Sequence, residues 1–354
     1  MSEYSLPQTT DNFTCYILGA GFSCGAGLPL SNNFLEKMDE VHAQYYLGIT
    51  PPSLNVPMDE LFRFRNKRSE FFDQYMSNNV EFWLSLVSAR TLGNVASRGF
   101  NKYMMQIAIA QTIAHYVQNS KNITFIDQFI TLVKQSEKRA IITLNYDDLI
   151  ERSCERVEIP YTYGINYRGL NHIFKIDLLN YKGKMLVDNE VQSSIPIYKL
   201  HGSYNWIAEQ ENILFISDMQ NFFLNKAEFW AGNEWIKYRF LIEPPTIDKM
   251  YAGRALSVIW GKAYDSLISA LHIIIIGYSF PENDGYVKYL LMASLVDNAA
   301  LKQVTIVDPS CDGSYKDRIK WLLELLVAKK VRIIFCQQNA EDWIHSQILG
   351  LHHN

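Results

Sequence analysis

Ten residues of this sequence, each placed shortly after an apolar run, are of types that could bind and cleave a nucleotide. Glycines let a backbone approach a ligand closely, carboxylates accept hydrogen bonds from ribose hydroxyls, and an imidazole changes charge near neutral pH. Asparagine and serine side chains can orient a hydroxyl or a water molecule. The ten residues are Gly19, Ala20, Gly21, Ser23, Asn145, Asp147, His201, Gly277, Ser279 and Asp308.

The first of these groups lies in the stretch CYILGAGFSCGAGLP, residues 15–29. Its apolar beginning is typical of a strand buried on both faces of a parallel sheet. Gly19 and Gly21 then predict a tight turn whose amides could cradle a phosphate, with Ser23 and the amides after it opening the next helix. The stretch departs from the dinucleotide fingerprint GxGxxG, because Cys24 stands three positions after Gly21. A turn without a ligand would use similar residues, so the glycines alone do not define a site.

The other groups follow four further predicted strands, at residues 140–144, 197–200, 272–276 and 303–307. Each of these residues, taken alone, could also have a purely structural role. Asn145 could cap a helix, His201 could be a satisfied core histidine, and an aspartate before a proline, such as Asp308, is common in turns. Because the carboxyl ends of parallel strands meet at one edge of a sheet, their joint occurrence predicts a single site there.

Strands that alternate with helices predict an α/β fold, with a Rossmann-like parallel sheet and helices on both faces. Helices are expected near residues 33–42, 254–270, 284–295 and 340–349. Residues 58–139 show only helical signals and no convincing strand, so we interpret them as a helical insertion or cap. Apolar residues at helical spacing support this interpretation, namely Met105, Ile109, Ile113, Val117, Phe125, Phe129 and Val133.

The composition limits the classes of function. At 354 residues and 48% hydrophobic, the chain can bury a sizeable core, as one large domain with insertions or as two modest domains. A net charge of −4 does not suggest a nucleic-acid surface, and we interpret the densest basic run, residues 63–70, as a solvated helix face. We therefore expect no direct nucleic-acid binding.

The cysteines and the N-terminus indicate a reducing compartment. The five cysteines are odd in number and widely spaced, and the N-terminus MSEYSLPQTT does not resemble a secretory signal. We therefore expect a cytoplasmic protein. The longest apolar run, near residues 271–276, is far too short to cross a bilayer, and the absence of any CxxC pair excludes a four-thiolate zinc ribbon.

Four motifs, in the expected order, resemble those of the sirtuin family. GAGFSCGAGLP at residues 19–29 resembles the family's GAGxSxxxGxP signature, and Thr143-Leu144-Asn145-Tyr146-Asp147 resembles its TxNxD motif. His201-Gly202 is similar to the HG pair that holds the family's catalytic histidine, and Gly277-Tyr278-Ser279 to its GxS nucleotide-binding turn. In their extended forms, TLNYDDLIE, KLHGSYNW and IGYSFPENDGY look most like the sirtuin-like NADases of prokaryotic anti-phage defence.

Two differences from the family's motifs indicate which branch of the family this chain resembles. Protein deacylases of this family carry a zinc ribbon after the HG motif, whereas this chain has no cysteine between Cys154 and Cys311. They also have Asp-Phe-Arg where Leu30-Ser31-Asn32 stands here. The resemblance therefore favours NAD hydrolysis without a metal, in a single NAD-binding domain over residues 1–354, with residues 206–251 in place of the zinc ribbon. A deacylase and a catalytically silent nucleotide-binding subunit are the alternatives.

The resemblance also implies roles for the ten residues. Asn145, Asp147 and His201 are expected to be catalytic: Asn145 orients a water molecule or the nicotinamide ribose, Asp147 favours the cationic transition state, and His201 acts as a base. The other seven are expected to bind NAD, with Asp308 on the ribose hydroxyls of the adenosine half. Because a cell must restrain an NADase, we expect control by homo-oligomerisation or by a partner, for which the resemblance suggests a HerA-type ring ATPase or a short Argonaute.

Overall fold

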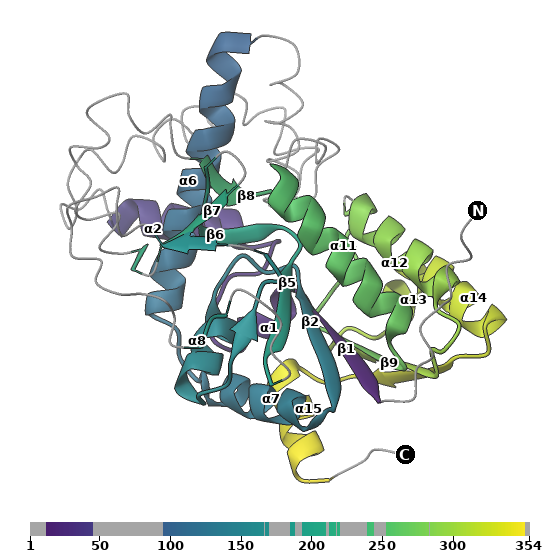
Figure 1. Ribbon diagram of the computed structural model, residues 1–354. Helices are drawn as coiled ribbons and strands as arrows, with labels where there is room; N and C mark the ends of the chain where they lie inside the picture. The colour runs from purple at the N-terminus through teal and green to yellow at the C-terminus, as the bar shows by residue number, and fades with distance from the viewer. Residues whose placement is uncertain are drawn as a thin grey trace.

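The computed structural model describes residues 12–44, 95–165, 167–169, 185–187, 193–209, 212–216, 218–219, 239–243, 253–282 and 284–350. Its centre is a seven-stranded parallel sheet (Figure 1). In spatial order the strands are β11 (Arg332–Cys336), β10 (Gln303–Val307), β9 (His272–Ile276), β1 (Phe13–Leu18), β2 (Lys138–Thr143), β5 (Ile195–Lys199) and β3 (Tyr161–Thr162). The predicted α/β class with a Rossmann-like sheet is confirmed.

The register of the sheet brings the predicted strand ends together. Leu18 at the end of β1 lies between Thr143 of β2 and Ile276 of β9, and Ile276 in turn pairs with Val307 of β10. The chain passes from β1 to β2 on one side and later returns to β9 on the other, so β1 lies at the switch point of the topology. Open α/β sheets bind their ligands at such a point, outside the carboxyl ends of the strands.

Helices cover both faces of the sheet, as Figure 1 shows. On one side lie α11 (Gly253–Ser269), α12 (Gly285–Asp297), α13 (Gly313–Arg318) and α14 (Lys320–Ala328). On the other lie α7 (Thr124–Gln135), α8 (Leu149–Arg156) and α15 (Ala340–Ile348). Strands covered on both faces are buried along most of their length, which explains the apolar residues that dominate β1, β2 and β9.

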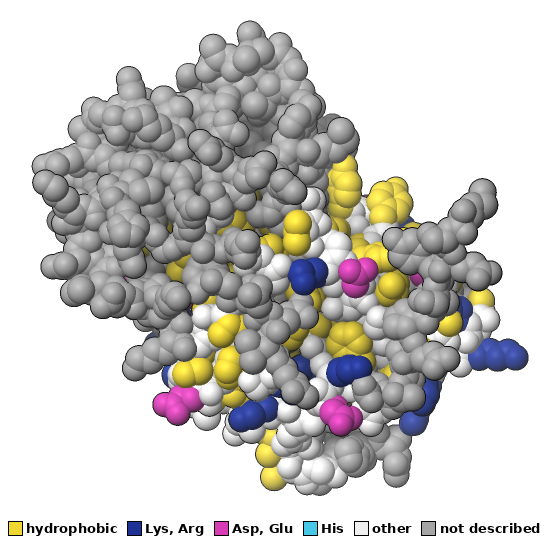
Figure 2. Space-filling model, viewed as in Figure 1, with side chains coloured by type: hydrophobic (Ala, Val, Ile, Leu, Met, Phe, Trp, Pro, Cys, Tyr) yellow, Lys and Arg dark blue, Asp and Glu magenta, His cyan; other side chains and the backbone are white. Residues whose placement is uncertain are grey.

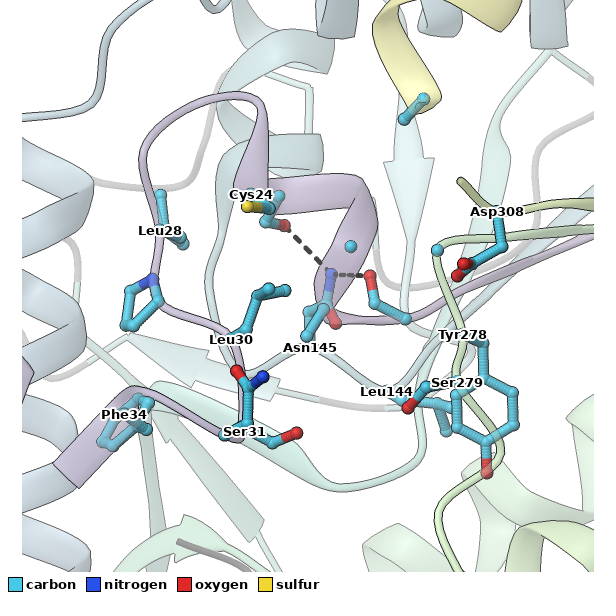
Figure 3. A pocket seen from close by; sticks show the side chains of 18 of the residues that line it. Cys24, Leu28, Leu30, Ser31, Phe34, Leu144, Asn145, Tyr278, Ser279 and Asp308 are labelled. Carbon is cyan, nitrogen blue, oxygen red and sulfur yellow. Dashed lines mark hydrogen bonds between the residues drawn. The ribbon is translucent and has the colours of Figure 1, made fainter. Parts of the chain in front are cut away.

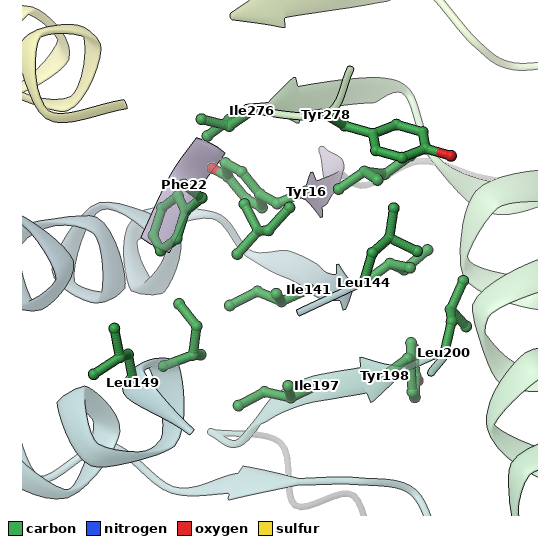
Figure 4. Close-up of a cluster of buried hydrophobic side chains, with 14 of the residues drawn as sticks. Tyr16, Phe22, Ile141, Leu144, Leu149, Ile197, Tyr198, Leu200, Ile276 and Tyr278 are labelled. Atoms are coloured by element: carbon green, nitrogen blue, oxygen red, sulfur yellow. The ribbon is translucent and has the colours of Figure 1, made fainter. Parts of the chain in front are cut away.

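Aromatic rings join the sheet to its helices. Figure 4 shows Tyr16, Phe22, Ile141 and Ile197 among the buried side chains of this core. The Tyr16 ring meets Phe129 of α7 edge-on, with the ring centroids 5.3 Å apart, and the Phe22 ring lies 4.9 Å from the same Phe129 ring. Phe22 belongs to the short helix α1 (Ala20–Cys24), so this packing fixes the turn that follows β1.

The predicted helices around residues 105–117 and 125–133 are confirmed as α6 (Val95–Gln118) and α7, and all seven apolar residues that predicted them are buried. α7 ends at Gln135 and β2 begins at Lys138, so the last residues of the segment 58–139 belong to the sheet. Residues 58–94 of that segment lie outside the described part of the chain. The role of the segment as an insertion or cap stays a prediction.

A second sheet of four strands, which the sequence pattern did not predict, packs against α6, and α6 also contacts α2 (Phe34–Gln44). Its order is β4 (Tyr167–Gly169), β7 (Asn212–Phe215), β6 (Gly202–Glu209) and β8 (Arg239–Ile242). The Gln106 side chain of α6 donates a hydrogen bond to the Ile242 carbonyl at 2.9 Å. Described parts of residues 206–251 thus form strands, and the rest of that segment lies outside the described residues.

The charge of the surface and the length of the helices are relevant to binding of nucleic acid and membranes. On the face seen in Figure 2, Lys and Arg side chains of the described residues lie scattered among hydrophobic and acidic ones. None of the helices in the described ranges combines the length and the apolar character that crossing a bilayer requires.

At Gly202, the first residue of β6, we predict a large effect of a single methyl group on stability. Its φ is +75°, and a Cβ atom there would lie 1.9 Å from the Leu241 carbonyl oxygen. We expect Gly202→Ala to lower the free energy of unfolding by about 2 kcal/mol or more, because an alanine is strained in this conformation and also clashes with β8. Urea denaturation measures the change.

Gly261 in α11 provides the matched control. A Cβ atom there has no neighbouring heavy atom within 4 Å, and the residue is exposed within a helix. Gly261→Ala should therefore stabilise the protein by up to about 1 kcal/mol, because alanine has the higher helix propensity. Equal effects of the two substitutions would contradict this account of Gly202.

Candidate functional site

An open cavity of about 700 Å³ lies at the carboxyl ends of β1, β2, β9 and β10, and all ten residues singled out in the sequence line it. Its volume is within the usual range for cofactor sites. In Figure 3, Asn145 lies between Leu28 and Leu30 on one side of the cavity and Ser279 and Asp308 on the other. The register of the sheet therefore brings together groups that are almost three hundred residues apart in the sequence.

The glycine turn after β1 is held by backbone contacts with the turn after β9. The Gly19 amide donates to the Ile276 carbonyl at 3.0 Å, and the Gly21 amide donates to the Gly277 carbonyl at 2.9 Å. A Cβ atom on Gly19 would lie 2.5 Å from the Gly277 oxygen, and one on Gly21 would lie 2.8 Å from the Gly277 Cα atom. Glycine is therefore required at both positions, because the backbones of the two turns are in direct contact.

This finding corrects the expected role of two amides. The sequence predicted that amides of the glycine turn cradle a phosphate, but the Gly19 and Gly21 amides already donate to the Ile276 and Gly277 carbonyls. The glycines line the cavity and set its shape. α1 also begins earlier than expected, at Ala20 inside the glycine turn, because the turn closes directly into a helix.

Asn145 and Asp147 are tied to the glycine turn through Ser23. The Asn145 side-chain amide donates to the Gly19 carbonyl and to Ser23 Oγ, each at 3.0 Å. The nearby Ser23 hydroxyl also acts to lower the pKa of the Asp147 carboxyl group, and Asp147 Oδ1 accepts from the Leu149 amide at 3.1 Å. This arrangement fixes the two side chains relative to α1 and leaves the Asn145 side-chain oxygen as the group able to accept from a ligand.

A buried ion pair contacts the main chain at Asp147. The Lys199 ammonium lies 3.0 Å from Glu151 Oε1 and donates to the Asp147 main-chain carbonyl, and the Tyr163 hydroxyl donates to the same Glu151 oxygen at 3.1 Å. Burial raises the pKa of the Asp147 and Glu151 carboxyl groups, and the nearby Lys199 charge opposes that rise. Sequence analysis missed this pair although Glu151 ends the stretch TLNYDDLIE and Lys199 begins KLHGSYNW, because only the fold brings the two elements together.

His201 lies at the opposite wall, with 3% of its side chain exposed. Its Nε2 is 3.6 Å from Oδ2 of Asp284, a buried carboxylate that also accepts from the Tyr278 hydroxyl at 2.8 Å. Asp284 was not among the predicted site residues, because an aspartate just before a helix is usually a cap. Its signal was nevertheless present in the motif IGYSFPENDGY.

Asp308 and Ser279 form the far end of the cavity together with Arg318, which the sequence did not reveal. Asp308 Oδ1 accepts from the Ser310 amide at 2.8 Å, so the aspartate does form the turn that its proline neighbour suggested. Partial burial raises the pKa of Asp308, and the Ser310 amide opposes the rise. Arg318 Nε donates to the Ser279 carbonyl at 3.3 Å, which places a guanidinium group at this end.

The described residues include no group of three or more His, Cys, Asp or Glu side chains arranged to hold a metal ion.

Comparisons with known proteins identify the family. The family model of the SIR2-like domain matches residues 139–334, which is more than half of the chain. The protein therefore belongs to the SIR2-like domain family, which confirms the resemblance to sirtuins at this level. No curated protein sequence matches the chain.

Solved Sir2 structures are similar at low identity. A Sir2 complex with the inhibitor EX-527, 2′-O-acetyl-ADP-ribose and a deacetylated p53 peptide is 12% identical, with 97% of this chain and 96% of that chain covered and a TM-score of 0.43. A Sir2 homologue mutant with 2′-O-acetyl-ADP-ribose is 11% identical, with 97% and 92% covered and a TM-score of 0.47. Sir2Tm bound to a propionylated peptide is 12% identical, with 97% and 95% covered and a TM-score of 0.42.

The buried ion pair predicts a stability change at Lys199. Lys199→Met leaves the Glu151 carboxylate buried without its cation, so we expect the free energy of unfolding at neutral pH to fall by about 3–5 kcal/mol. Because burial raises the pKa of Glu151 in the folded protein, the loss should shrink as the pH falls and the carboxyl group takes up a proton. Urea denaturation at several pH values measures both effects.

The double variant Lys199→Met with Glu151→Gln is the control. Removing both charges should recover most of the stability lost in Lys199→Met. If the double variant is as unstable as Lys199→Met at every pH, the loss arises from packing and not from the unpaired carboxylate.

Proposed function

We propose that this protein is an NAD hydrolase, which cleaves the nicotinamide–ribose bond to give nicotinamide and ADP-ribose. The observation that carries the proposal is that Asn145, His201 and the glycine turn, from three distant motifs of a SIR2-like chain, line one cavity. The wall combines an amide, an imidazole and carboxylates in a partly buried setting. Such a wall suits a reaction in which charge moves within the substrate.

The proposed orientation of NAD follows from the two ends of the cavity. Asp308 accepts from the ribose hydroxyls of the adenosine half, as acidic residues do in dinucleotide folds. The pyrophosphate lies along Ala20 and the turn of Gly277 and Ser279, where the Arg318 guanidinium offsets its charge. The nicotinamide ribose then reaches the end lined by Asn145 and His201.

The proposed chemistry needs little acid catalysis, because the nicotinamide is a cation in NAD and leaves as a neutral molecule. The bond between ribose C1′ and the ring nitrogen breaks with both electrons passing to the nitrogen, which leaves an oxocarbenium-like ribose. One water molecule adds at C1′, and His201 accepts its proton or that of a ribose hydroxyl. Asn145 orients the water or the ribose, and the Asp147 carboxylate favours the cationic state.

NAD-dependent deacylation is a second candidate because part of the cavity wall is apolar. Leu28, Phe34, Ile109 and Ile113 line it, and an acyl chain could pack against such a surface. Product analysis separates the two reactions. A hydrolase releases nicotinamide and ADP-ribose in equal amounts from NAD alone, whereas strict dependence on an acylated peptide would overturn the proposal in favour of deacylation.

The proposed biological role rests on the sequence resemblance to defence NADases. An unrestrained NAD hydrolase would deplete the cofactor of its own cell, so we propose that homo-oligomerisation or a partner controls the activity. A HerA-type ring ATPase and a short Argonaute are the partner classes that the resemblance suggests. NAD depletion would then serve anti-phage defence in the cytoplasm.

Substitutions at the nicotinamide end test the assignment of catalytic residues. His201→Ala and Asn145→Ala should each lower kcat by about 10²-fold or more, because they remove groups that act on the transition state. The affinity for NAD should change much less in His201→Ala, since the pyrophosphate and adenosine contacts remain. Rates are measured by chromatography of the products, and affinity by calorimetry.

Cys24 offers a control in the same cavity. It is exposed and lies beside the glycine turn, outside the proposed machinery, so Cys24→Ser should retain the wild-type rate. The variants are compared under conditions in which the wild-type protein cleaves NAD. Folded His201→Ala and Asn145→Ala proteins that turn over NAD at the wild-type rate would show that the active site lies elsewhere.

A further inference from the structure

We propose that Asp284 is the positioning residue of His201: its carboxylate orients the imidazole and stabilises the cation that forms when His201 accepts a proton. The inference rests on the proposed function, in which His201 is the base. It concerns a residue that was not among the ten sequence-predicted site residues, and it arises from the geometry of the wall between β9 and α12.

The first observation is that Asp284 stands at a capping position without acting as a cap. It immediately precedes α12, yet its side chain accepts no hydrogen bond from the first amides of that helix. An aspartate in this position normally stabilises the helix through such a bond. The carboxylate turns inward instead, where 2% of the side chain is exposed. A buried carboxylate is costly unless it is paired.

The partners of this carboxylate are the second observation. Tyr278 donates its hydroxyl hydrogen to Asp284 Oδ2 at 2.8 Å, and the same oxygen lies 3.6 Å from His201 Nε2. Tyr278 is itself fixed, because its carbonyl accepts from the Tyr315 hydroxyl at 2.8 Å. The turn that lines the cavity therefore holds the carboxylate in place against the imidazole.

A separation of 3.6 Å is longer than a normal hydrogen bond, so the contact in this state is electrostatic. Catalytic hydrogen bonds are often long without substrate and shorten in the complex. At this distance a carboxylate favours the imidazolium, whereas burial disfavours it. Asp284 thus offsets the cost of charging a buried histidine, which is the role that an acidic residue has beside the base of a hydrolytic triad.

Other polar groups also face His201 and share its environment. Asp147 lines the same cavity, the Tyr146 ring lies 6.1 Å from the imidazole between centroids, and the Glu243 amide donates to the His201 carbonyl at 2.9 Å. Lys199 lies two residues before His201, and its ammonium group contacts Glu151. The test must therefore change the charge of Asp284 and leave these groups intact.

Asp284→Asn makes that change, because asparagine has the same shape and can still accept from Tyr278. We expect kcat for NAD cleavage to fall about 10²-fold, KM to stay within about threefold, and the acidic limb of the pH–rate profile to move about one unit toward lower pH. The limb moves in this direction because the imidazolium loses its counter-charge and gives up its proton more readily. Asp284→Glu should restore part of the rate.

Tyr278→Phe is the matched control. It removes the hydrogen bond that holds the carboxylate and keeps the charge, so its acidic limb should remain close to that of the wild type. If Tyr278→Phe moves the limb as far as Asp284→Asn does, the effect comes from disturbed packing and the proposal fails. Circular dichroism and thermal unfolding verify that each variant is folded.

A second readout does not depend on turnover. The titration of His201, followed by NMR in the wild-type and Asp284→Asn proteins, should show a midpoint about one pH unit lower in the variant. An unchanged midpoint overturns the proposal, and so does a shifted midpoint with an unchanged rate. If Asp284→Asn lowers the His201 midpoint but the wild-type protein does not cleave NAD, the pair of Asp284 and His201 is supported and the proposed function is overturned. The failure of this inference and the failure of the proposed function are therefore distinguishable.

Discussion

The direct contact of two backbone turns is the constraint on which the site depends. The turns after β1 and β9 meet so closely that Gly19, Gly21 and Gly277 leave no space for a Cβ atom. Two amide-to-carbonyl bonds, to the Ile276 and Gly277 oxygens, lock the turns together. This contact decides where α1 begins and where Ser23 lies, and through Ser23 it decides the positions of Asn145 and Asp147. A change in the backbone contact would therefore alter the whole wall.

Buried charge is the second property of the molecule that needs an explanation. Glu151 and Lys199 lie beneath the cavity, and Asp147, His201 and Asp284 lie in its wall, all with little access to water. Such groups destabilise a fold unless they are paired, and each has at least one polar contact. Burying apolar side chains at these positions would cost less free energy. The position of these ionisable groups near the carboxyl ends of β2, β5 and β9 agrees with the proposed stabilisation of a positive charge away from bulk water.

The sequence predicted much of this arrangement, and the exceptions have physical causes. The strands predicted at residues 272–276 and 303–307 match β9 and β10, because strands covered on both faces consist mostly of apolar residues. The ten site residues line one cavity because parallel strands end at one edge. Arg318 and the Lys199–Glu151 pair stayed hidden, since tertiary contacts alone bring them into place. The second sheet was missed because its short strands lie among aromatic and turn residues without a clear period.

The central claim is that the cavity at the strand ends binds NAD with its nicotinamide ribose toward Asn145. A crystal structure of the His201→Ala protein grown with NAD tests it most directly, because the slowed variant should hold intact substrate. The account predicts the nicotinamide ribose beside Asn145, the pyrophosphate along the turns after β1 and β9, and the adenosine ribose at Asp308. NAD bound outside this cavity, or bound with the adenosine ribose beside Asn145, would contradict it.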